Sequence, residues 1–338
     1  MLASLAAKNA LRYVLDAREG DSIVILCDDE KAEIGKAFEK GAQALQLNTK
    51  LVLLETATDV FRKDIPQQIQ KYFTTERPDI YVNIFRGTRE ETPFRIKIIH
   101  TETQDHKKRL GHCPGVTIDM LTDGALALTA KQHQRMQNFA DALMERLKPA
   151  TKIEIQNPAG TQLTLSVKDR PFFTDTRFDW KLMKWVNLPT GEVMVAPVED
   201  SLNGRLVSDM AIGGIGPLQA PVEITAENGV AKKVTSANAD VVKRILGTQK
   251  TDAMAKVVGE FAFGINPKAK FVEEFLECEK ILGTIHIAFG DNTDFPGGKN
   301  DSTNHMDFMV SKPSVNATTS EGKVIPVLKD GVFQETRR

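Results

Sequence analysis

The chain has 338 residues, of which 41% are hydrophobic and 26% charged, and its formal net charge is -1. This composition indicates a globular protein of about two domains, and it excludes a nucleic-acid partner that is bound through overall positive charge. No apolar stretch approaches the roughly 20 residues that span a membrane, so we expect no membrane partner. No basic segment precedes the short apolar start, and the three cysteines form no CxxC pair. Both features favour a cytoplasmic location.

Short apolar segments alternate with helical patterns in the first part of the chain. Strands that alternate with helices predict a parallel sheet covered on both faces, so we predict a doubly wound, mostly parallel α/β domain over residues 1–150. No GxGxxG or Walker A motif follows the first strand, which argues against a dinucleotide or phosphate loop there. We expect strands at 22–27, 50–54 and 79–85, and helices at 30–46, 61–73, 92–103 and 130–147.

The pattern changes after Lys148-Pro149-Ala150. Residues 151–156 and 161–166 alternate like strands around a turn, which predicts a β-hairpin. More strands follow to about residue 235, and helices are expected at about 239–246 and 270–280. We therefore predict an α+β domain over residues 151–338.

Two carboxylates lie in unusual surroundings in this second part. Glu192 follows a Pro-Thr-Gly turn and opens an apolar strand, and the alternative interpretation is a solvated acid at a turn. Glu260 lies between Val258 and Phe261. A buried carboxylate needs a partner, which a metal ion, an arginine or a lysine would supply. The alternative for Glu260 is a structural salt bridge.

Two histidines lie on strand-like segments further along. In the segment 284–290, alternation places His286 on a face whose other residues are small, which leaves room for a ligand or an ion. The alternative is a core histidine with ordinary hydrogen bonds. His305 and Asp307 share one face of their strand, an arrangement that suits a metal, and the alternative is a surface hydrogen bond between them.

Together these motifs offer two imidazoles and three carboxylates. Such ligands, without a thiolate, suit zinc, cobalt, manganese or iron(II). Five ligands exceed what one hydrolytic zinc usually takes from a protein, which favours a two-metal site with ions about 3.5–4 Å apart.

Several motifs resemble, in the same order, those of the M29 metallopeptidases, the thermophilic-type aminopeptidase T and aminopeptidase S family. They are Asn187 to Pro197, Gly259 to Pro267, Glu279 to Gly290 and His305-x-Asp307, together with Gly111 to Thr117. The resemblance implies an α/β N-terminal domain, a metal-binding C-terminal domain, a homodimer, and two divalent ions (Zn, Co, Mn or Mg). The metal ligands that it implies are Glu192, Glu260, His286, His305 and Asp307, with Glu192 or Glu260 as the catalytic base.

One position departs from the family pattern. The peptidases have a tyrosine shortly after the His-x-Ala-x-Gly motif, and Thr293 stands there in this chain. A phenol at this position would steady a metal or an oxyanion. Without it, the sequence predicts metal binding more directly than peptide hydrolysis.

Three hypotheses follow for the function. The first is a metal-dependent aminopeptidase acting on small peptides, with Glu199 or Asp200 as candidates for binding the substrate amine. The second is an iron(II) dioxygenase of the dihydroxypyridine type, with His286, His305 and Asp307 as its ligands and a small-molecule substrate. The third is a degenerate, non-enzymatic relative that binds a ligand or a partner.

Overall fold

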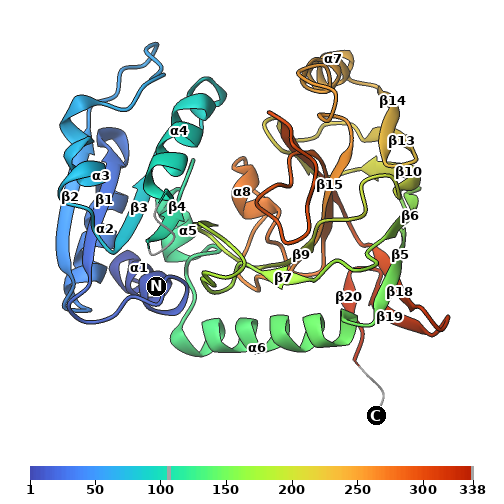
Figure 1. Cartoon of the computed structure of the whole chain (residues 1–338), viewed down its shortest axis with the longest axis horizontal. Coiled ribbons are helices and arrows are strands. Elements are labelled where there is room, and N and C mark those ends of the chain that lie inside the picture. Colours follow the sequence, from blue (N-terminus) through green and yellow to red (C-terminus); the bar gives the residue numbers. More distant parts are fainter. Residues whose placement is uncertain (105–107, 336–338) are drawn as a thin grey trace. The chain divides into compact units, whose positions relative to one another are not determined.

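The computed structural model of the protein describes residues 1–104 and 108–335. The chain divides into two compact units, which are described separately (Figure 1). The predicted domain boundary near residue 150 remains a prediction. The first unit comprises Met1–Asn138, Asp175–Thr190 and Pro267–Lys270, and the second comprises Phe139–Thr174, Gly191–Asn266 and Phe271–Arg338.

The first unit is built on a five-stranded parallel sheet with the strand order β2-β1-β3-β4-β8. The central strands are apolar on both faces, as expected for a sheet that is covered on both sides. Apolar side chains of α1 and α2 pack on one face and those of α3 and α4 on the other. This confirms the predicted doubly wound, parallel fold. The strands are β1 Ser22–Asp28, β2 Asn48–Leu54, β3 Ile80–Ile84, β4 Arg109–His112 and β8 Val186–Asn187.

One helix predicted for the first unit differs from the structure, and the short helix α5, Ile118–Thr122, was not predicted. The helix predicted over 61–73 is reduced to a 3₁₀ turn at Gln67–Ile69 and the single turn of α3, Lys71–Thr74. Pro66 disfavours helical backbone in the residue before it, and Arg62 is held in ion pairs with Asp28 and Glu91 instead. The other helices are α1 Ala3–Tyr13, α2 Ala32–Gln43, α4 Thr92–Glu102, α5 Ile118–Thr122 and α6 Ala130–Leu147, whose last residues belong to the second unit.

An eight-stranded antiparallel sheet forms one part of the second unit, with the order β14-β13-β10-β6-β5-β18-β19-β20. It contains the predicted hairpin, in which β5 and β6 pair from Lys152 opposite Ser166 to Gln156 opposite Gln162. Its strands are β5 Ala150–Gln156, β6 Gln162–Ser166, β10 Asn203–Ser208, β13 Val222–Glu227, β14 Val230–Ser236, β18 Ser314–Thr319, β19 Val324–Lys329 and β20 Val332–Phe333.

A seven-stranded antiparallel sheet, with the order β12-β11-β17-β16-β15-β9-β7, forms the other part. Its middle strands are buried almost throughout, and Ser208 of β10 donates a hydrogen bond to the carbonyl of Met309 in β17, which ties the two sheets together. Its strands are β7 Phe173–Thr174, β9 Glu192–Val195, β11 Ala211–Ile212, β12 Gly216–Pro217, β15 Val258–Gly264, β16 Ile285–Gly290 and β17 His305–Val310.

Two helices complete the second unit. α7, Ala239–Thr248, begins where predicted, because the Asn238 side chain accepts hydrogen bonds from the backbone of Asp240 and Val241. The helix predicted over 270–280 is shorter, with only α8, Phe275–Cys278. The residues after it turn toward β15, where the backbone N–H of Asn266 donates to the carbonyl of Lys280. Among the residues that the structure describes, no helix is long and apolar enough to cross a membrane.

Candidate metal centre

Three adjacent strands of the seven-stranded sheet carry most of the sequence-predicted site. In the observed register, Glu260 of β15 lies opposite Ala288 of β16, which in turn lies opposite Asp307 of β17. Because side chains alternate along a strand, His286 and His305 lie on the same face as these residues. Phe261, Ile287 and Phe308 line up across the opposite, apolar face. The small side chain of Ala288 lies between the two acids on this face.

Glu192 enters the cluster from β9, where it lies opposite Gly264 of β15. The residue before it, Gly191, has a φ of 136°, and a Cβ at this position would lie 2.5 Å from the Cβ of Asn266. Only glycine meets both conditions, since other residues rarely adopt this backbone and have no room here. The Thr-Gly-Glu sequence therefore places the first residue of β9 against the end of β15.

The structure brings all five predicted side chains together. The Nε2 atom of His286 lies 3.4 Å from Glu192 Oε1, 3.3 Å from Glu260 Oε1 and 4.0 Å from Asp307 Oδ1. The Nε2 atom of His305 lies 3.1 Å from Glu260 Oε2 and 3.3 Å from Asp307 Oδ1. Five side chains from four strands thus point their ligand atoms at one region.

These separations fit donor atoms around a metal ion. Two donors about 2.1 Å from one ion, at a tetrahedral angle, lie about 3.4 Å apart. Most of the contacts to the two histidines exceed the 2.9 Å or so that is typical of a good N–H···O hydrogen bond. The donor set of imidazoles and carboxylates suits zinc, cobalt, manganese or iron(II). The residues present therefore fit a divalent ion.

The orientation of His305 is set by its second nitrogen. Its Nδ1 atom lies 2.7 Å from the backbone carbonyl oxygen of Asp291, which has no proton and so accepts a hydrogen bond from the ring. This contact keeps a proton on Nδ1, so Nε2, which faces Glu260 and Asp307, is the nitrogen that would bind a metal ion once its own proton is lost. A second hydrogen bond of this kind is the usual support for a metal-binding histidine.

The cluster is buried and strongly negative. Glu192 and Glu260 are 4% exposed and His286 is 1% exposed, whereas 34% of the His305 side chain reaches solvent. Burial lowers the pKa of His286, but the charges of Glu192 and Glu260 outweigh it and raise that pKa to about 10. Burial also opposes the charged form of His305, yet Asp307 and Glu260 raise its pKa well above the usual value. The acids thus stabilise positive charge, on the histidines or on a bound cation, within the cluster.

Two neighbouring residues that had no role in the sequence prediction also belong to the cluster. Glu279 offers a ligand atom within 4.8 Å of those of Glu192 and His286. Lys280 Nζ lies 2.6 Å from Glu192 Oε2 and 2.8 Å from Glu279 Oε1. Both residues belong to the motif that precedes His286. The only signal in the sequence was a pair of opposite charges just before a buried strand.

Other residues named from the sequence have different surroundings. The hydroxyl of the exposed Thr293 donates to the carboxylate of Asp291, at 3.0 Å. Glu199 is bound by Arg170 at 2.7 Å, and it accepts a hydrogen bond from the backbone of Lys299 at 3.0 Å. The Glu199 carboxylate is therefore already paired, which leaves it poorly suited to bind a substrate amine.

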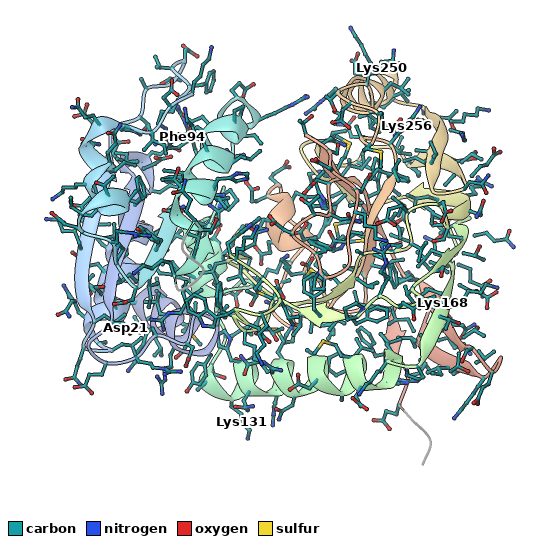
Figure 2. All side chains as sticks on the ribbon, in the orientation of Figure 1. Asp21, Phe94, Lys131, Lys168, Lys250 and Lys256 are labelled. Atoms are coloured by element: carbon teal, nitrogen blue, oxygen red, sulfur yellow. The ribbon has the colours of Figure 1, made fainter. Side chains whose placement is uncertain are left out.

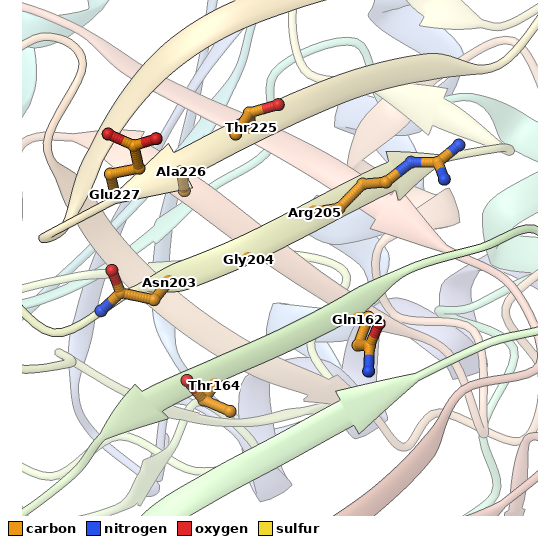
Figure 3. A pocket seen from close by; sticks show the side chains of 8 residues that line it. All are labelled: Gln162, Thr164, Asn203, Gly204, Arg205, Thr225, Ala226 and Glu227. Atoms are coloured by element: carbon orange, nitrogen blue, oxygen red, sulfur yellow. The ribbon is translucent and has the colours of Figure 1, made fainter.

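A separate depression lies over strands β6, β10 and β13 of the eight-stranded sheet (Figure 3). Arg205 is its only cation among the described lining residues, and it pairs with Glu223 at 2.8 Å. The depression contains none of the clustered acids and histidines, so it is separate from the candidate metal centre. Its lining residues are Gln162, Thr164, Asn203, Gly204, Arg205, Thr225, Ala226 and Glu227.

Comparison with known proteins defines the class of the molecule. The family model for the thermophilic metalloproteases (M29) matches residues 122–333, which contain the whole cluster. The chain therefore belongs to the thermophilic metalloprotease (M29) family, as its motifs predicted.

Two solved structures share the fold. Wild-type AmpT from Thermus thermophilus has a TM-score of 0.71 and 16% sequence identity, over 98% of this chain and 99% of that chain. A 2,5-dihydroxypyridine dioxygenase from Pseudomonas putida KT2440 has the same TM-score and identity, over 99% of this chain and 97% of that chain. No curated protein matches the sequence significantly. At these identities the similarity establishes the fold alone.

Proposed function

We propose that the protein is a metal-dependent aminopeptidase that removes N-terminal residues from small peptides. The observation that carries the proposal is the convergence of Glu192, Glu260, His286, His305 and Asp307 at separations typical of metal ligands. Membership of a metalloprotease family supports hydrolysis as the reaction.

Each side chain has a role that follows from its position. Glu260 lies between the two histidines, 3.3 Å from one and 3.1 Å from the other, and is best placed as a ligand together with His286, His305 and Asp307. A bound divalent ion would lower the pKa of a water ligand and polarise the scissile carbonyl. Glu192 lies at the side of this group, where its carboxylate takes a proton from the attacking water and returns it to the leaving amine.

The substrate approaches from the side of His305. This is the most exposed of the five side chains, whereas His286 is 1% exposed. The buried face keeps bulk water from the reacting atoms and strengthens the electrostatic interactions there.

Hydrolysis of aminoacyl anilides tests the proposal. Metal-free protein is supplied with Zn²⁺, Co²⁺, Mn²⁺ or Mg²⁺ and assayed with leucine and alanine anilides, with N-acetylated anilides as matched controls. Cleavage of the free-amine substrates alone, lost in Glu260→Gln, supports an aminopeptidase. Metal-loaded protein that cleaves no anilide or peptide of a broad panel contradicts it.

The second candidate is an iron(II) dioxygenase acting on a dihydroxypyridine. The observation that favours it is Thr293, whose hydroxyl is engaged by Asp291 where the peptidases have a tyrosine. His286, His305 and Asp307 provide two imidazoles and one carboxylate, the ligand set of non-haem iron(II) oxygenases. Oxygen consumption by iron-loaded protein with 2,5-dihydroxypyridine, without anilide cleavage, would favour this candidate over the peptidase. Protein that binds metal but shows neither activity would favour a degenerate relative.

The assembly and the location remain proposals. We propose a homodimer in the cytoplasm, from the resemblance to the family and from the three scattered cysteines, all of which are unpaired and buried. Sedimentation equilibrium tests the dimer, and fractionation of cells tests the location.

A further inference from the structure

Lys280 is an unusual lysine in this protein. Labelled lysines such as Lys131, Lys168, Lys250 and Lys256 extend into solvent (Figure 2), whereas Lys280 is 2% exposed. Lysine is almost never fully buried unless its ammonium group is paired. Here the ammonium lies 2.6 Å from Glu192 Oε2 and 2.8 Å from Glu279 Oε1, so a buried cation bridges two buried acids.

The ligand atoms of the cluster form two groups that share one histidine. The first group is Glu192, Glu279 and His286, and the second is Glu260, His286 and Asp307. Within each group the ligand atoms lie within 4.8 Å of one another. Two groups joined by a shared residue form two adjacent cation positions, as in a two-metal site. The Lys280 ammonium is bonded to both carboxylates of the first group.

We propose that the Lys280 ammonium takes the place of a second metal ion, so that the protein holds one divalent ion per chain. The ion is bound by Glu260, His286, His305 and Asp307, and the inference rests on the metal centre of the proposed function. A second divalent ion at the first group would have to displace the ammonium or stand directly beside its positive charge. Both are unfavourable in a buried site, where charges are poorly screened. This differs from the two ions that the family resemblance implies.

The backbone holds Lys280 in this position. Its carbonyl accepts a hydrogen bond from the N–H of Asn266 at 2.9 Å, and its own N–H donates to the carbonyl of Glu277 at 3.1 Å. The next residue packs against the end of β15, since a Cβ on Gly264 would lie 2.2 Å from the carbonyl oxygen of Ile281. Because the backbone of Lys280 is hydrogen-bonded on both sides, its side chain starts from a fixed position and reaches Glu192.

The lysine also has a consequence for Glu192. One carboxylate oxygen, Oε2, is bonded to the ammonium, while the other, Oε1, lies 3.4 Å from His286 Nε2. The ammonium therefore orients this carboxylate with one oxygen toward the single ion. Lys280 acts through Glu192 and is a positioning residue.

Metal stoichiometry of the wild-type protein is the first test. Metal-free protein is titrated with Mn²⁺ by calorimetry, and the loaded protein is examined by elemental analysis and electron paramagnetic resonance. We expect one Mn²⁺ per chain and the six-line signal of an isolated ion. Two ions per chain with an exchange-coupled signal overturn the role of Lys280 and leave the proposed hydrolase standing. Protein that binds no ion contradicts the metal centre itself, and with it the proposed function.

Variants then test whether Lys280 is the cause. Lys280→Ala is expected to bind two Mn²⁺ per chain, and Lys280→Ala combined with Glu279→Gln is expected to return to one. Arg170→Met is the matched control, because it removes a cation that is 8% exposed and paired with Glu199, outside the cluster. It should keep one ion. A folded Lys280→Ala that still binds one ion overturns the inference. If that variant does not fold, the metal-loaded wild-type crystal decides, since anomalous density between Glu192 and Glu279 contradicts the proposal and its absence supports it.

Discussion

Each unit of the protein contains a buried cluster of charges, and the two clusters differ in how they are balanced. In the first unit, the acids Asp28 and Glu91 meet Arg62 and Arg86. Arg62 bonds Asp28 at 2.5 Å and Glu91 at 2.6 Å, and Arg86 bonds Glu91 at 2.6 Å. Two negative and two positive charges are thus matched by short, direct hydrogen bonds. Such a cluster needs no further ion to neutralise its charges.

The cluster of the second unit is not balanced in this way. Lys280 contacts two of its acids, Glu192 and Glu279, while Glu260 and Asp307 contact the histidines, whose pKa values the acids raise. Its histidines lie 3.1–4.0 Å from the acids, which leaves space between the donor atoms. The comparison teaches that buried charges alone do not identify a site. Acids that face histidines at the spacing of metal ligands do.

The largest effect on stability is expected when the balanced cluster of the first unit loses an acid. Glu91→Ala leaves Arg62 and Arg86 without their shared partner, and we expect the free energy of unfolding to fall by about 3–5 kcal/mol. Urea denaturation measures the change. The exposed neighbour Glu90 provides the control, since Glu90→Ala should change the free energy by less than about 0.5 kcal/mol. Equal effects of the two substitutions would show that the first cluster does not stabilise the fold.

Removing an acid from the cluster of the second unit should affect binding more than folding. Glu260→Gln takes away a carboxylate that faces both histidines, and we expect metal affinity to fall at least about 100-fold, or about 2.7 kcal/mol. Calorimetric titration with Zn²⁺ measures the loss. The unfolding free energy of the metal-free protein should change less than in Glu91→Ala. The exposed acid Glu227, changed to Gln, should leave metal affinity unaltered, and a similar loss there would point to a general charge effect.

Acid should weaken the balanced cluster over a defined range of pH. Burial raises the pKa of Glu91, but hydrogen bonds from Arg62 and Arg86 outweigh it and lower that pKa from the ordinary 4.5 to about 2. A carboxylate with a lowered pKa stabilises the fold above its unfolded pKa, and this contribution is lost as the pH falls through the folded pKa. We expect Glu91 to contribute fully above about pH 5 and progressively less toward pH 2. Unfolding free energies of the wild type and Glu91→Gln at several pH values should converge on acidification, and parallel curves would contradict the assignment.

The smallest expected effect concerns Thr293. Its hydroxyl is bonded to the half-buried Asp291 and not to a clustered side chain, so it does not replace the phenol of the family tyrosine. Thr293→Ala should change kcat/KM for an aminoacyl anilide by less than about twofold, as expected for an exposed side chain. Thr293→Ser is the matched control that keeps the hydroxyl. A tenfold loss in the alanine variant alone would give Thr293 a direct part in the reaction.

Local sequence patterns were sufficient for the parts of the fold that depend on neighbours in the chain. The alternation of strands and helices predicted the parallel sheet, because each crossover helix must cover the strands that it connects. The alternation of side chains placed His286 among small residues and His305 beside Asp307, because successive residues of a strand face opposite sides. The predicted helix over 61–73 was wrong in its first half, where a long-range ion pair of Arg62 prevailed over the local pattern.

The sequence by itself therefore determined the class of fold and was sufficient to predict five of the clustered side chains. Tertiary structure decided how they meet, through the register that sets Glu260 opposite Ala288 and through the close backbone contacts at Gly191 and Gly264. It also decided that Lys280 turns inward between Glu192 and Glu279. Periodicity could not show this, because those acids lie 88 residues and one residue away from the lysine along the chain. Which charges neutralise one another depends on distances that only the folded chain defines.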